Sequence, residues 1–257
     1  MATASLYRSA DFAARAAEVL GNRADSQRWR RLADQTRAAF RRAYVRHDGR
    51  IVSDAQAVYA LAIHFGLLEP DERAYAGDRL EYLVREGGFR SGTGFAGTPF
   101  VVWALWETGH ADSAFALLLQ NENPSWLYAV ELGATTIWER WDSLLPDGSV
   151  NPGDMTSFNH YALGAVVDWL YKVVAGIRPA EPGYSRVTLQ PTPGPGLEWA
   201  RGAIDSRRGR IESAWRREGD SIVFECVIPG GVEADVLLPD GQKVVVGSGQ
   251  HRFVIAA

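Results

Sequence analysis

The stretch HYALGAVVDWLYKVVAG, residues 160–176, marks the point at which the pattern of the sequence changes. Before Gly176, apolar residues recur at spacings of three and four, which is typical of helices with one buried face. After it, apolar residues alternate with other residues, as Ile222, Phe224 and Cys226 do, which is typical of strands. The stretch itself predicts one long final helix. We therefore expect a mainly α chain with a C-terminal all-β domain.

Upstream of this stretch, the sequence predicts helices that come in pairs with short, glycine-marked turns. Such pairs are typical of α/α hairpin arrays, either a solenoid or a closed α/α toroid. We favour the toroid, because no fixed-period repeat is present and because long loops at 87–97 and 121–158 interrupt the pairs. Long loops that hold aromatic and acidic residues indicate function. The predicted helices begin at Ser9–Asp11, at Asp25 or Ser26, after Ser53-Asp54, at Pro70, at Thr98-Pro99 and at Ala111.

Downstream of the same stretch, alternating runs at 221–228 and 232–238 are separated by glycine-containing turn signals. They predict a small antiparallel β-domain, which we interpret as a sandwich. A proline-rich segment joins it to the helices and contributes a first strand at 185–190. We place the two domains at residues 1–178 and 179–257.

The composition is that of an ordinary globular protein, with 46% hydrophobic and 23% charged residues. The formal net charge of −4 gives no basic surface, so nucleic acid is not an expected partner. No window predicts a membrane span, and the N-terminal segment lacks the apolar core of a secretory signal, so we expect a cytoplasmic protein. Cys226 is the only cysteine, which excludes an internal disulfide, and we expect it to be a small buried residue in a strand. No P-loop, dinucleotide-binding or zinc-protease motif occurs, so neither a metal nor a cofactor is expected.

The stretch GATTIWERWDS, residues 133–143, places a tryptophan on either side of Glu139. Indoles stack on the apolar faces of sugar rings, and cleavage of a glycosidic bond needs one carboxylic acid and one carboxylate. The residues alone support equally well a surface ion pair between Glu139 and Arg140 or Arg178. His160 has two interpretations as well: a neutral imidazole that bonds a sugar hydroxyl, or a structural side chain that caps the helix or bonds a carbonyl.

These stretches also resemble a known family, the family 78 glycoside hydrolases, which are α-L-rhamnosidases. The similarity lies in the C-terminal half of that family and covers nearly the whole chain. It implies part of an (α/α)6 barrel followed by a β-sandwich, and inverting hydrolysis of terminal α-L-rhamnose in a rhamnose-containing glycoside. The pieces that carry it, in the order of the family, are SDAQAVYALAIHFGLL, TGFAGTPFVVWAL, LLLQNENPSWLY, GATTIWERWDS and NPGDMTSFNHYALGAVVDWLYKVVAGIRP.

The resemblance also implies roles for particular residues. Glu139 corresponds to the general base of the family, which activates the attacking water, and His160 to a histidine that contacts the rhamnose. Arg90 stands where we expect the family to favour histidine, so substrate contacts there are expected to differ. Five further residues are expected to line or support the pocket: Trp138, Trp141 and Asp142 from the same motif, and Trp126 and Phe95 as parts of its wall.

One part of the family pattern is absent from these residues. The general acid of the family lies upstream, in a stretch of the R-D-E-R…W-T-G-D kind, and nothing like it occurs here. We therefore expect a fragment, a partial barrel plus the sandwich, with little or no rhamnosidase activity by itself. A second chain that supplies the rest of the barrel, or self-association through an exposed apolar seam, is the expected partnership.

Three other functions remain open from the sequence. The chain could be a carbohydrate-binding remnant that does no chemistry. It could be another α/α-toroid enzyme, either a different glycosidase or a lyase that uses Tyr161 and His160 as base and acid. It could also be a purely structural interaction scaffold, although this leaves the indole-flanked acid unexplained.

Overall fold

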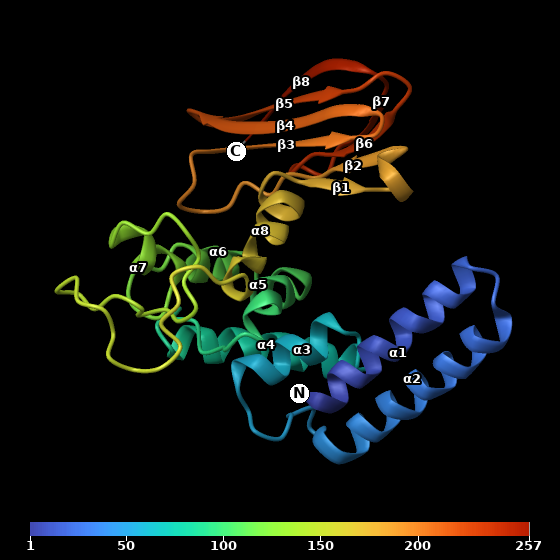
Figure 1. Cartoon of the computed structure of the whole chain (residues 1–257). Coiled ribbons are helices and arrows are strands. Elements are labelled where there is room, and N and C mark those ends of the chain that lie inside the picture. The colour runs from blue at the N-terminus through green and yellow to red at the C-terminus, as the bar shows by residue number, and fades with distance from the viewer. Residues whose placement is uncertain (257) are drawn as a thin grey trace. The chain divides into compact units, whose positions relative to one another are not determined.

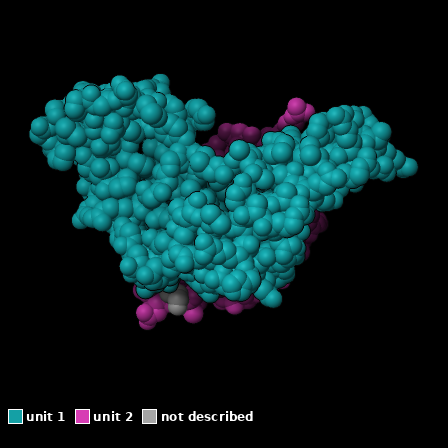
Figure 2. Space-filling view, turned by 90° about the horizontal axis from the view of Figure 1, so that it is seen from below, with its two compact units in different colours: residues 1–164 teal, residues 165–257 magenta. Residues whose placement is uncertain are grey.

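The computed structural model describes residues 1–256, which form two compact units, residues 1–164 and 165–256. Figure 1 labels their helices and strands, and Figure 2 colours the first unit teal and the second magenta. The first unit is built from helices and long loops. The second begins with a short helical segment and holds all the described strands. The predicted domain boundary at 178/179 falls inside the first strand and stays a prediction.

Two long helices form the first hairpin of the helical unit, α1 (Ala2–Val19) and α2 (Arg23–Tyr44). The predicted start of the first helix at Ser9 is wrong, because the alanine-rich segment before it favours helix and contains no breaker. The predicted caps of the second helix are also wrong: the Asn22 side chain accepts a hydrogen bond from the Asp25 backbone N–H at 3.1 Å. The face of α1 that is buried consists of small residues, Ala4, Ala10, Ala14 and Ala17.

The next four helices pair as predicted. They are α3 (Gln56–His64), α4 (Pro70–Glu86), α5 (Thr98–Glu107) and α6 (Ala111–Leu118). Helix α3 packs against α4 and α5, and α5 packs against α6. Because α3 and α5 are apolar on nearly all sides, they lie in the interior, whereas α4 buries one face only. The prediction of α/α hairpins is confirmed.

Two long loops follow α4 and α6, as the sequence predicts, and they lie within the same unit. The second of them contains a short helix that the sequence did not reveal, α7 (Trp126–Glu131). Ser125 begins it by accepting a hydrogen bond from the Tyr128 backbone N–H at 3.2 Å. Between α7 and residue 162 the loop forms no helix or strand, and a single bridge joins Leu144 to Val150.

The stretch that predicts one helix over 160–176 is helical but irregular. It runs through a 3₁₀ turn (Ala162–Ala165), α8 (Val166–Trp169) and a π-helical turn (Leu170–Val174). The predicted start at His160 is wrong by two residues, because the His160 ring accepts the backbone N–H of Ala162 at 3.3 Å. Within the second unit, Trp215 Nε1 donates to Val174 O at 2.8 Å, which ties the end of this segment to a strand.

The strands form two four-stranded sheets. The first has the order β1 (Ile177–Pro179), β2 (Arg186–Leu189), β6 (Glu233–Leu237), β7 (Lys243–Val246). The second has the order β3 (Trp199–Ser206), β4 (Gly209–Glu218), β5 (Ser221–Ile228), β8 (Gly249–Ala256) and is antiparallel throughout. The prediction of a sandwich-like, largely antiparallel domain is confirmed. One pair differs, since β2 and β6 are parallel.

The single cysteine lies where the sequence places it. Cys226 is in β5 and is 3% exposed. Burial raises the pKa of its thiol to about 12, since the thiolate is poorly solvated there. Across the described residues, no helix combines the length and the apolar character that a bilayer crossing requires.

Candidate active site

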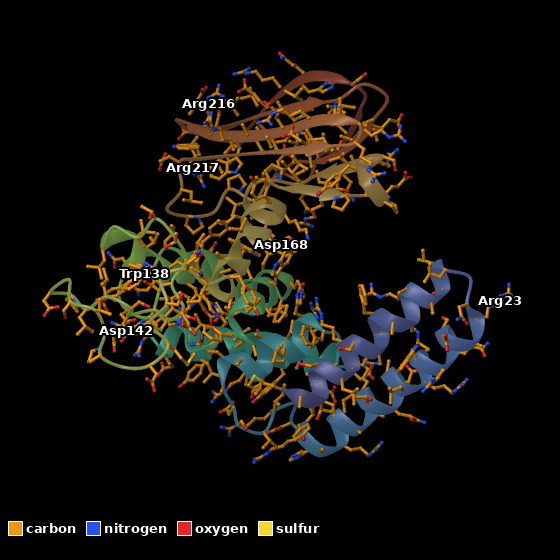
Figure 3. The ribbon with its side chains drawn as sticks, viewed as in Figure 1. Arg23, Trp138, Asp142, Asp168, Arg216 and Arg217 are labelled. Atoms are coloured by element: carbon orange, nitrogen blue, oxygen red, sulfur yellow. The ribbon has the colours of Figure 1, made fainter. Side chains whose placement is uncertain are left out.

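A pocket of about 450 Å³ lies in the helical unit, where its two long loops meet. Glu139, Trp141 and Asp142 line it from the second loop, and Phe95 lines it from the first. Four of the seven candidate residues that the sequence singled out therefore lie on one concave surface. Figure 3 labels Asp142 on this loop, together with Trp138. Their roles in binding or catalysis remain predictions.

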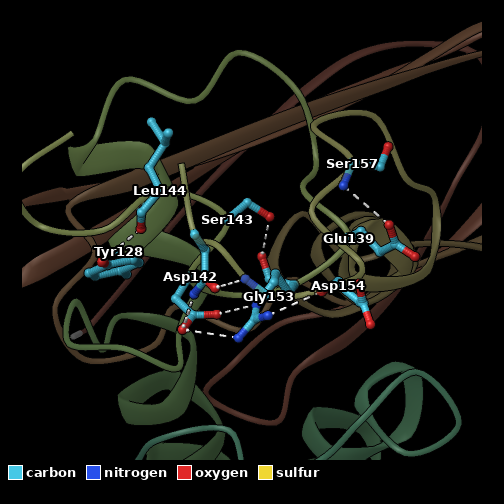
Figure 4. A network of polar contacts seen from close by, with 10 residues as sticks. Tyr128, Glu139, Asp142, Ser143, Leu144, Gly153, Asp154 and Ser157 are labelled. Atoms are coloured by element: carbon cyan, nitrogen blue, oxygen red, sulfur yellow. Dashed lines mark hydrogen bonds and ion pairs between the residues drawn. The ribbon is translucent and has the colours of Figure 1, made fainter. Parts of the chain in front are cut away.

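The backbone holds Glu139 at two points. Its own N–H donates to Ser157 O at 2.8 Å. The Ser157 N–H donates to Glu139 Oε2 at 3.2 Å, as Figure 4 shows. Within residues 1–256, Oε1 accepts no hydrogen bond, so one oxygen of this half-buried carboxylate remains available to a water or a ligand. An oriented carboxylate with a free oxygen is what a general base requires.

The surface ion pair with Arg140 that the sequence left open for Glu139 is not formed, and the pair with Arg178 stays a prediction. Arg140 points to a different acid: its Nε lies 2.6 Å from Asp142 Oδ1. Arg178 donates to Lys172 O at 2.7 Å and to Gln190 Oε1 at 3.4 Å, all within the second unit.

Arg140 and Asp142 form a network that holds the segment from Asn151 to Asp154, in the same loop as Glu139 (Figure 4). Asn151 Nδ2 donates to Asp142 Oδ2 at 3.0 Å, and Arg140 Nη1 donates to Asp154 O at 3.1 Å. A Cβ on Gly153 would lie 2.6 Å from Arg140 Nη1, so the loop backbone passes close to the guanidinium. Both oxygens of Asp142 are therefore engaged in holding this loop.

The two indoles beside Glu139 have different surroundings. Trp141 lines the pocket and packs edge-on against Trp126, with ring centres 5.4 Å apart. Trp126 is buried and its Nε1 donates to Leu163 O at 2.8 Å, so it supports Trp141 from behind. Trp138 is only 5% exposed and packs edge-on against Phe158 at 5.5 Å. Trp138 does not line the pocket. Of the two indoles beside Glu139, only that of Trp141 faces it.

His160 lies in a stack of three rings. Its imidazole lies 4.8 Å from the ring of Phe95 and 5.1 Å from that of Tyr161, both nearly parallel to it. Because Nδ1 accepts the Ala162 N–H, the proton of the neutral ring sits on Nε2. Nε2 has no hydrogen-bond partner among the described residues, so it remains a donor for a ligand. The imidazole thus caps the helical segment with one nitrogen and leaves the other available.

Two other residues that the sequence singled out lie elsewhere. Tyr161 is 87% exposed and does not line the pocket. Arg90 forms an ion pair with Glu122, a neighbour across the two loops. Within the described part of the chain, no cluster of three or more His, Cys, Asp or Glu side chains is arranged to hold a metal ion.

Sequence reasoning missed three residues that shape the site, namely Ser157, Arg140 and Asn151. Ser157 acts through its backbone, for which no side-chain signal exists. Arg140 and Asn151 had a usable signal, because an arginine two residues before an aspartate and an Asn-Pro-Gly turn both indicate a hydrogen-bonded loop.

The first unit consists of helical hairpins with a glutamate in an aromatic-lined pocket, and the second is a sandwich-like β unit. This is the arrangement that the resemblance to a glycoside hydrolase implies. Two family models match the chain: the bacterial alpha-L-rhamnosidase 6 hairpin glycosidase domain over residues 1–174, and the bacterial alpha-L-rhamnosidase C-terminal domain over residues 176–253. The chain belongs to the bacterial α-L-rhamnosidase family, and the resemblance inferred from the sequence is confirmed.

Individual relatives agree with this assignment. An α-L-rhamnosidase of Streptomyces avermitilis is 39% identical over 99% of the chain, and one of Formosa agariphila is 34% identical over 92%. The chain spans 26% of the length of each.

Solved structures agree as well. The native α-L-rhamnosidase of Aspergillus terreus superposes with a TM-score of 0.94 at 36% identity, over 98% of this chain and 30% of that one. The Streptomyces avermitilis enzyme complexed with L-rhamnose gives 0.92 at 38% identity, over 99% of this chain and 26% of that one.

Proposed function

We propose that this chain forms part of an inverting α-L-rhamnosidase in which Glu139 is the general base. The observation that carries the proposal is the placement of the Glu139 carboxylate, which is held by the Ser157 backbone and leaves Oε1 free in an aromatic-lined pocket. Similarity to an enzyme solved in complex with L-rhamnose supports rhamnose as the sugar.

The chemistry follows from the needs of an inverting reaction. Water attacks the anomeric carbon from the face opposite the leaving group while the glycosidic C–O bond breaks. The carboxylate of Glu139 takes the proton that the water loses, and a second, protonated carboxyl gives a proton to the leaving oxygen. Both protons are thereby accounted for, and the sugar is released with inverted configuration.

The remaining pocket residues would bind and orient the sugar. Trp141 and Phe95 offer apolar surfaces for the apolar face and the methyl group of a deoxyhexose. The free Nε2–H of His160 would donate to a sugar hydroxyl, since the stacking with Phe95 fixes the ring beside the pocket. These contacts place the anomeric carbon relative to Glu139, and correct placement is a large part of catalysis.

The acid is the part of the mechanism that these residues do not supply. Of the other carboxylates that line the pocket, Asp142 is engaged by Arg140 and Asn151, and Asp154 is exposed on the loop. The family resemblance places the acid upstream. We therefore propose that it comes from polypeptide beyond residues 1–257, either more of the same protein or a second chain. Its loss would reduce the rate by a factor of about 10²–10⁴.

Hydrolysis of an aryl α-L-rhamnoside tests both parts of the proposal. Residues 1–257 should turn over little substrate alone, and a polypeptide extended to the length of the relatives should turn it over readily. Glu139→Gln in the extended polypeptide should reduce kcat by a factor of about 10²–10⁴. Asp147→Asn, an exposed carboxylate of the same loop, is the matched control and should leave kcat unchanged. Turnover that survives Glu139→Gln would contradict the role of Glu139.

Asp154→Asn tests whether the acid lies inside or outside residues 1–257. If the acid lies outside residues 1–257, this variant keeps its activity. Loss of activity in Asp154→Asn together with turnover by residues 1–257 alone would place the acid inside this chain instead.

The alternatives have less support. A lyase that uses Tyr161 needs that hydroxyl in the pocket, whereas the side chain is exposed outside its lining. One experiment distinguishes a carbohydrate-binding remnant from an enzyme. The extended polypeptide of a remnant would bind L-rhamnose and would not hydrolyse the aryl rhamnoside.

A further inference from the structure

A second concave surface lies in the β unit, on the sheet formed by β3, β4, β5 and β8. Its groove has a volume of about 980 Å³, more than twice that of the pocket around Glu139. Ile211, Ser213 and Trp215 of β4 are buried on the inner face of this sheet, so the alternate residues Glu212 and Ala214 point outward. The outward residues line the groove, and none of them takes part in the site already described.

Small and charged residues alternate across the groove. The register places Arg201 of β3 opposite Ala214, and Glu225 of β5 opposite Ala214 on its other side. Ala203 and Val227 flank Glu212 in the next row in the same way. Ala214 therefore leaves a low point between Arg201 and Glu225 in the first row, whereas in the next row Glu212 stands between two smaller residues.

Most of these charges are already paired. Arg216 lies 2.7 Å and Arg252 lies 3.5 Å from Glu225, and Arg210 lies 3.0 Å from Asp205. Arg201 is different: its guanidinium makes no hydrogen bond or ion pair with any of residues 1–256, although it lines the groove. A guanidinium with all five donors free is suited to a bidentate carboxylate.

An exposed indole stands next to this arginine. Trp199 is 63% exposed and lies two residues before Arg201 on β3, so both side chains are on the outer face, with Cα atoms about 6–7 Å apart along the strand. The register places Trp199 opposite Arg216, in the row next to the groove. An exposed indole offers a flat apolar surface for the ring of a sugar.

We propose that this face binds an acidic saccharide, with a pyranose ring on Trp199 and the carboxylate of a uronic acid on Arg201. The ligand is expected to be acidic because the one uncommitted charge in the groove is positive. General attraction of polyanions does not explain such binding, since the chain has a formal net charge of −4. This inference does not depend on the proposed role of Glu139.

Titration of residues 1–257 with an oligogalacturonate, followed by calorimetry, tests the proposal. We expect saturable binding that L-rhamnose does not displace. Arg201→Ala should weaken it by at least about ten-fold, since it removes a charge-assisted hydrogen-bonded pair. Trp199→Ala should weaken it by a similar factor, and Trp199→Phe, which keeps an aromatic surface, by less. Arg208→Ala, an exposed arginine in the turn after β3, is the matched control and should bind like the wild type.

Each other outcome contradicts the proposal. Absence of binding overturns it, as does equal loss in Arg201→Ala and Arg208→Ala, which would indicate unspecific charge attraction. Equal affinity for an uncharged galacto-oligosaccharide removes the role of the carboxylate. Tighter binding of an oligoglutamate peptide would mean that the face recognises acidic protein rather than sugar. Trp199 and Arg201 are both exposed, so the variants are expected to fold. Unchanged circular dichroism would show that misfolding is not the cause of weaker binding.

Discussion

At the scale of single residues, the carboxylate of Glu139 owes its position to backbone rather than to charge. The Ser157 N–H fixes one oxygen, and the Ser157 hydroxyl donates elsewhere, to Asn159 O at 3.3 Å. Substitution of the serine side chain should therefore leave the hydrogen bond from the Ser157 backbone N–H to Glu139 in place. The loop that carries Ser157 depends instead on Arg140, which holds Asp154 O and Asp142.

Arg140→Gln is accordingly predicted to lower kcat for an aryl α-L-rhamnoside by a factor of about 10–100 in the extended polypeptide, because misplacement of a reacting group by about 1 Å costs that much. KM should change less, since Arg140 supports Glu139 and is not proposed to bind the sugar. Steady-state kinetics measure both constants. Arg85→Gln, which removes an exposed arginine paired with Glu81 on α4, is the control and should have wild-type kinetics. A large rise in KM at constant kcat would mean that Arg140 binds substrate directly.

The same residues show how far sequence reasoning reaches. Glu139, Trp141, Asp142 and Phe95 could be assigned to one pocket because the family resemblance implies it, and all four line the same pocket in the structure. The orientation of Trp138 could not be foreseen, since alternation along an irregular loop has no fixed period. Its indole turns inward because Phe158, far along the same loop, provides the contact that buries it.

At the scale of elements, helices α3 to α6 were predictable because proline, glycine and serine or aspartate mark their ends. Pro70 begins α4, and Glu69 and Glu72 close a capping box around its first turn. The short elements were not predictable. Helix α7 is too short for a periodic pattern, and the parallel pairing of β2 with β6 joins segments that are distant in the sequence.

Gly176, which ends the helical segment, is predicted to tolerate no side chain. Its φ is +78°, and a Cβ there would lie 2.2 Å from the backbone nitrogen of Pro191. Gly176→Ala should lower the free energy of unfolding by more than about 1 kcal/mol, which urea denaturation measures. Gly230→Ala is the control, since its φ is ordinary and nothing lies within 4 Å of the added carbon. Equal stability of the two variants would contradict this reading of the turn.

An ion-pair network joins the loop before α3 to α4. Arg79 donates to both oxygens of Asp54, at 3.0 and 2.6 Å, and Tyr59 donates to Oδ1 at 2.7 Å. The hydrogen bonds from Arg79, joined by those from Tyr59 and Arg50, hold the pKa of the Asp54 carboxyl well below its usual range. Burial, followed by the bond to Asp54, raises the pKa of Tyr59 to about 12.

This network predicts a particular dependence of stability on pH. Because the folded-state pKa of Asp54 is depressed, its contribution is fully present above the unfolded pKa of about 4 and is lost as pH falls below it. Asp54→Asn should therefore lower the free energy of unfolding by about 1–3 kcal/mol at pH 7, and by progressively less between pH 4 and more acidic values. Urea denaturation at several pH values measures this. A destabilisation that is the same at pH 3 and pH 7 would show that lost packing, rather than charge, is responsible.

At the scale of the whole molecule, Cys226 reports on the folding of the β unit. Because burial raises its thiol pKa to about 12, the thiolate is scarce in the folded protein. We predict that an aromatic disulfide reagent labels Cys226 slowly in buffer and rapidly in urea, with a midpoint that follows the loss of the β-sheet signal. Rapid labelling of the folded protein would contradict the buried position in β5.

The division of the chain into a helical unit and a β unit could be predicted, because the period of apolar residues changes once, near Gly176. What the sequence of this chain alone could not supply is the second carboxyl group of the proposed active site. The chain spans 26% of the Streptomyces and Formosa relatives. A glycosidase site needs two carboxyl groups on opposite faces of the sugar, and Glu139 is proposed as one of them.

The stereochemistry of the product tests the central claim most directly. Proton NMR during the first minutes of aryl α-L-rhamnoside hydrolysis by the extended polypeptide distinguishes the anomer that is released before mutarotation. If Glu139 directs a water to the anomeric carbon, β-L-rhamnose appears first, and the same signal is lost in Glu139→Gln. Initial release of α-L-rhamnose, or β-L-rhamnose formed at an undiminished rate by the Glu139→Gln variant, would contradict the account.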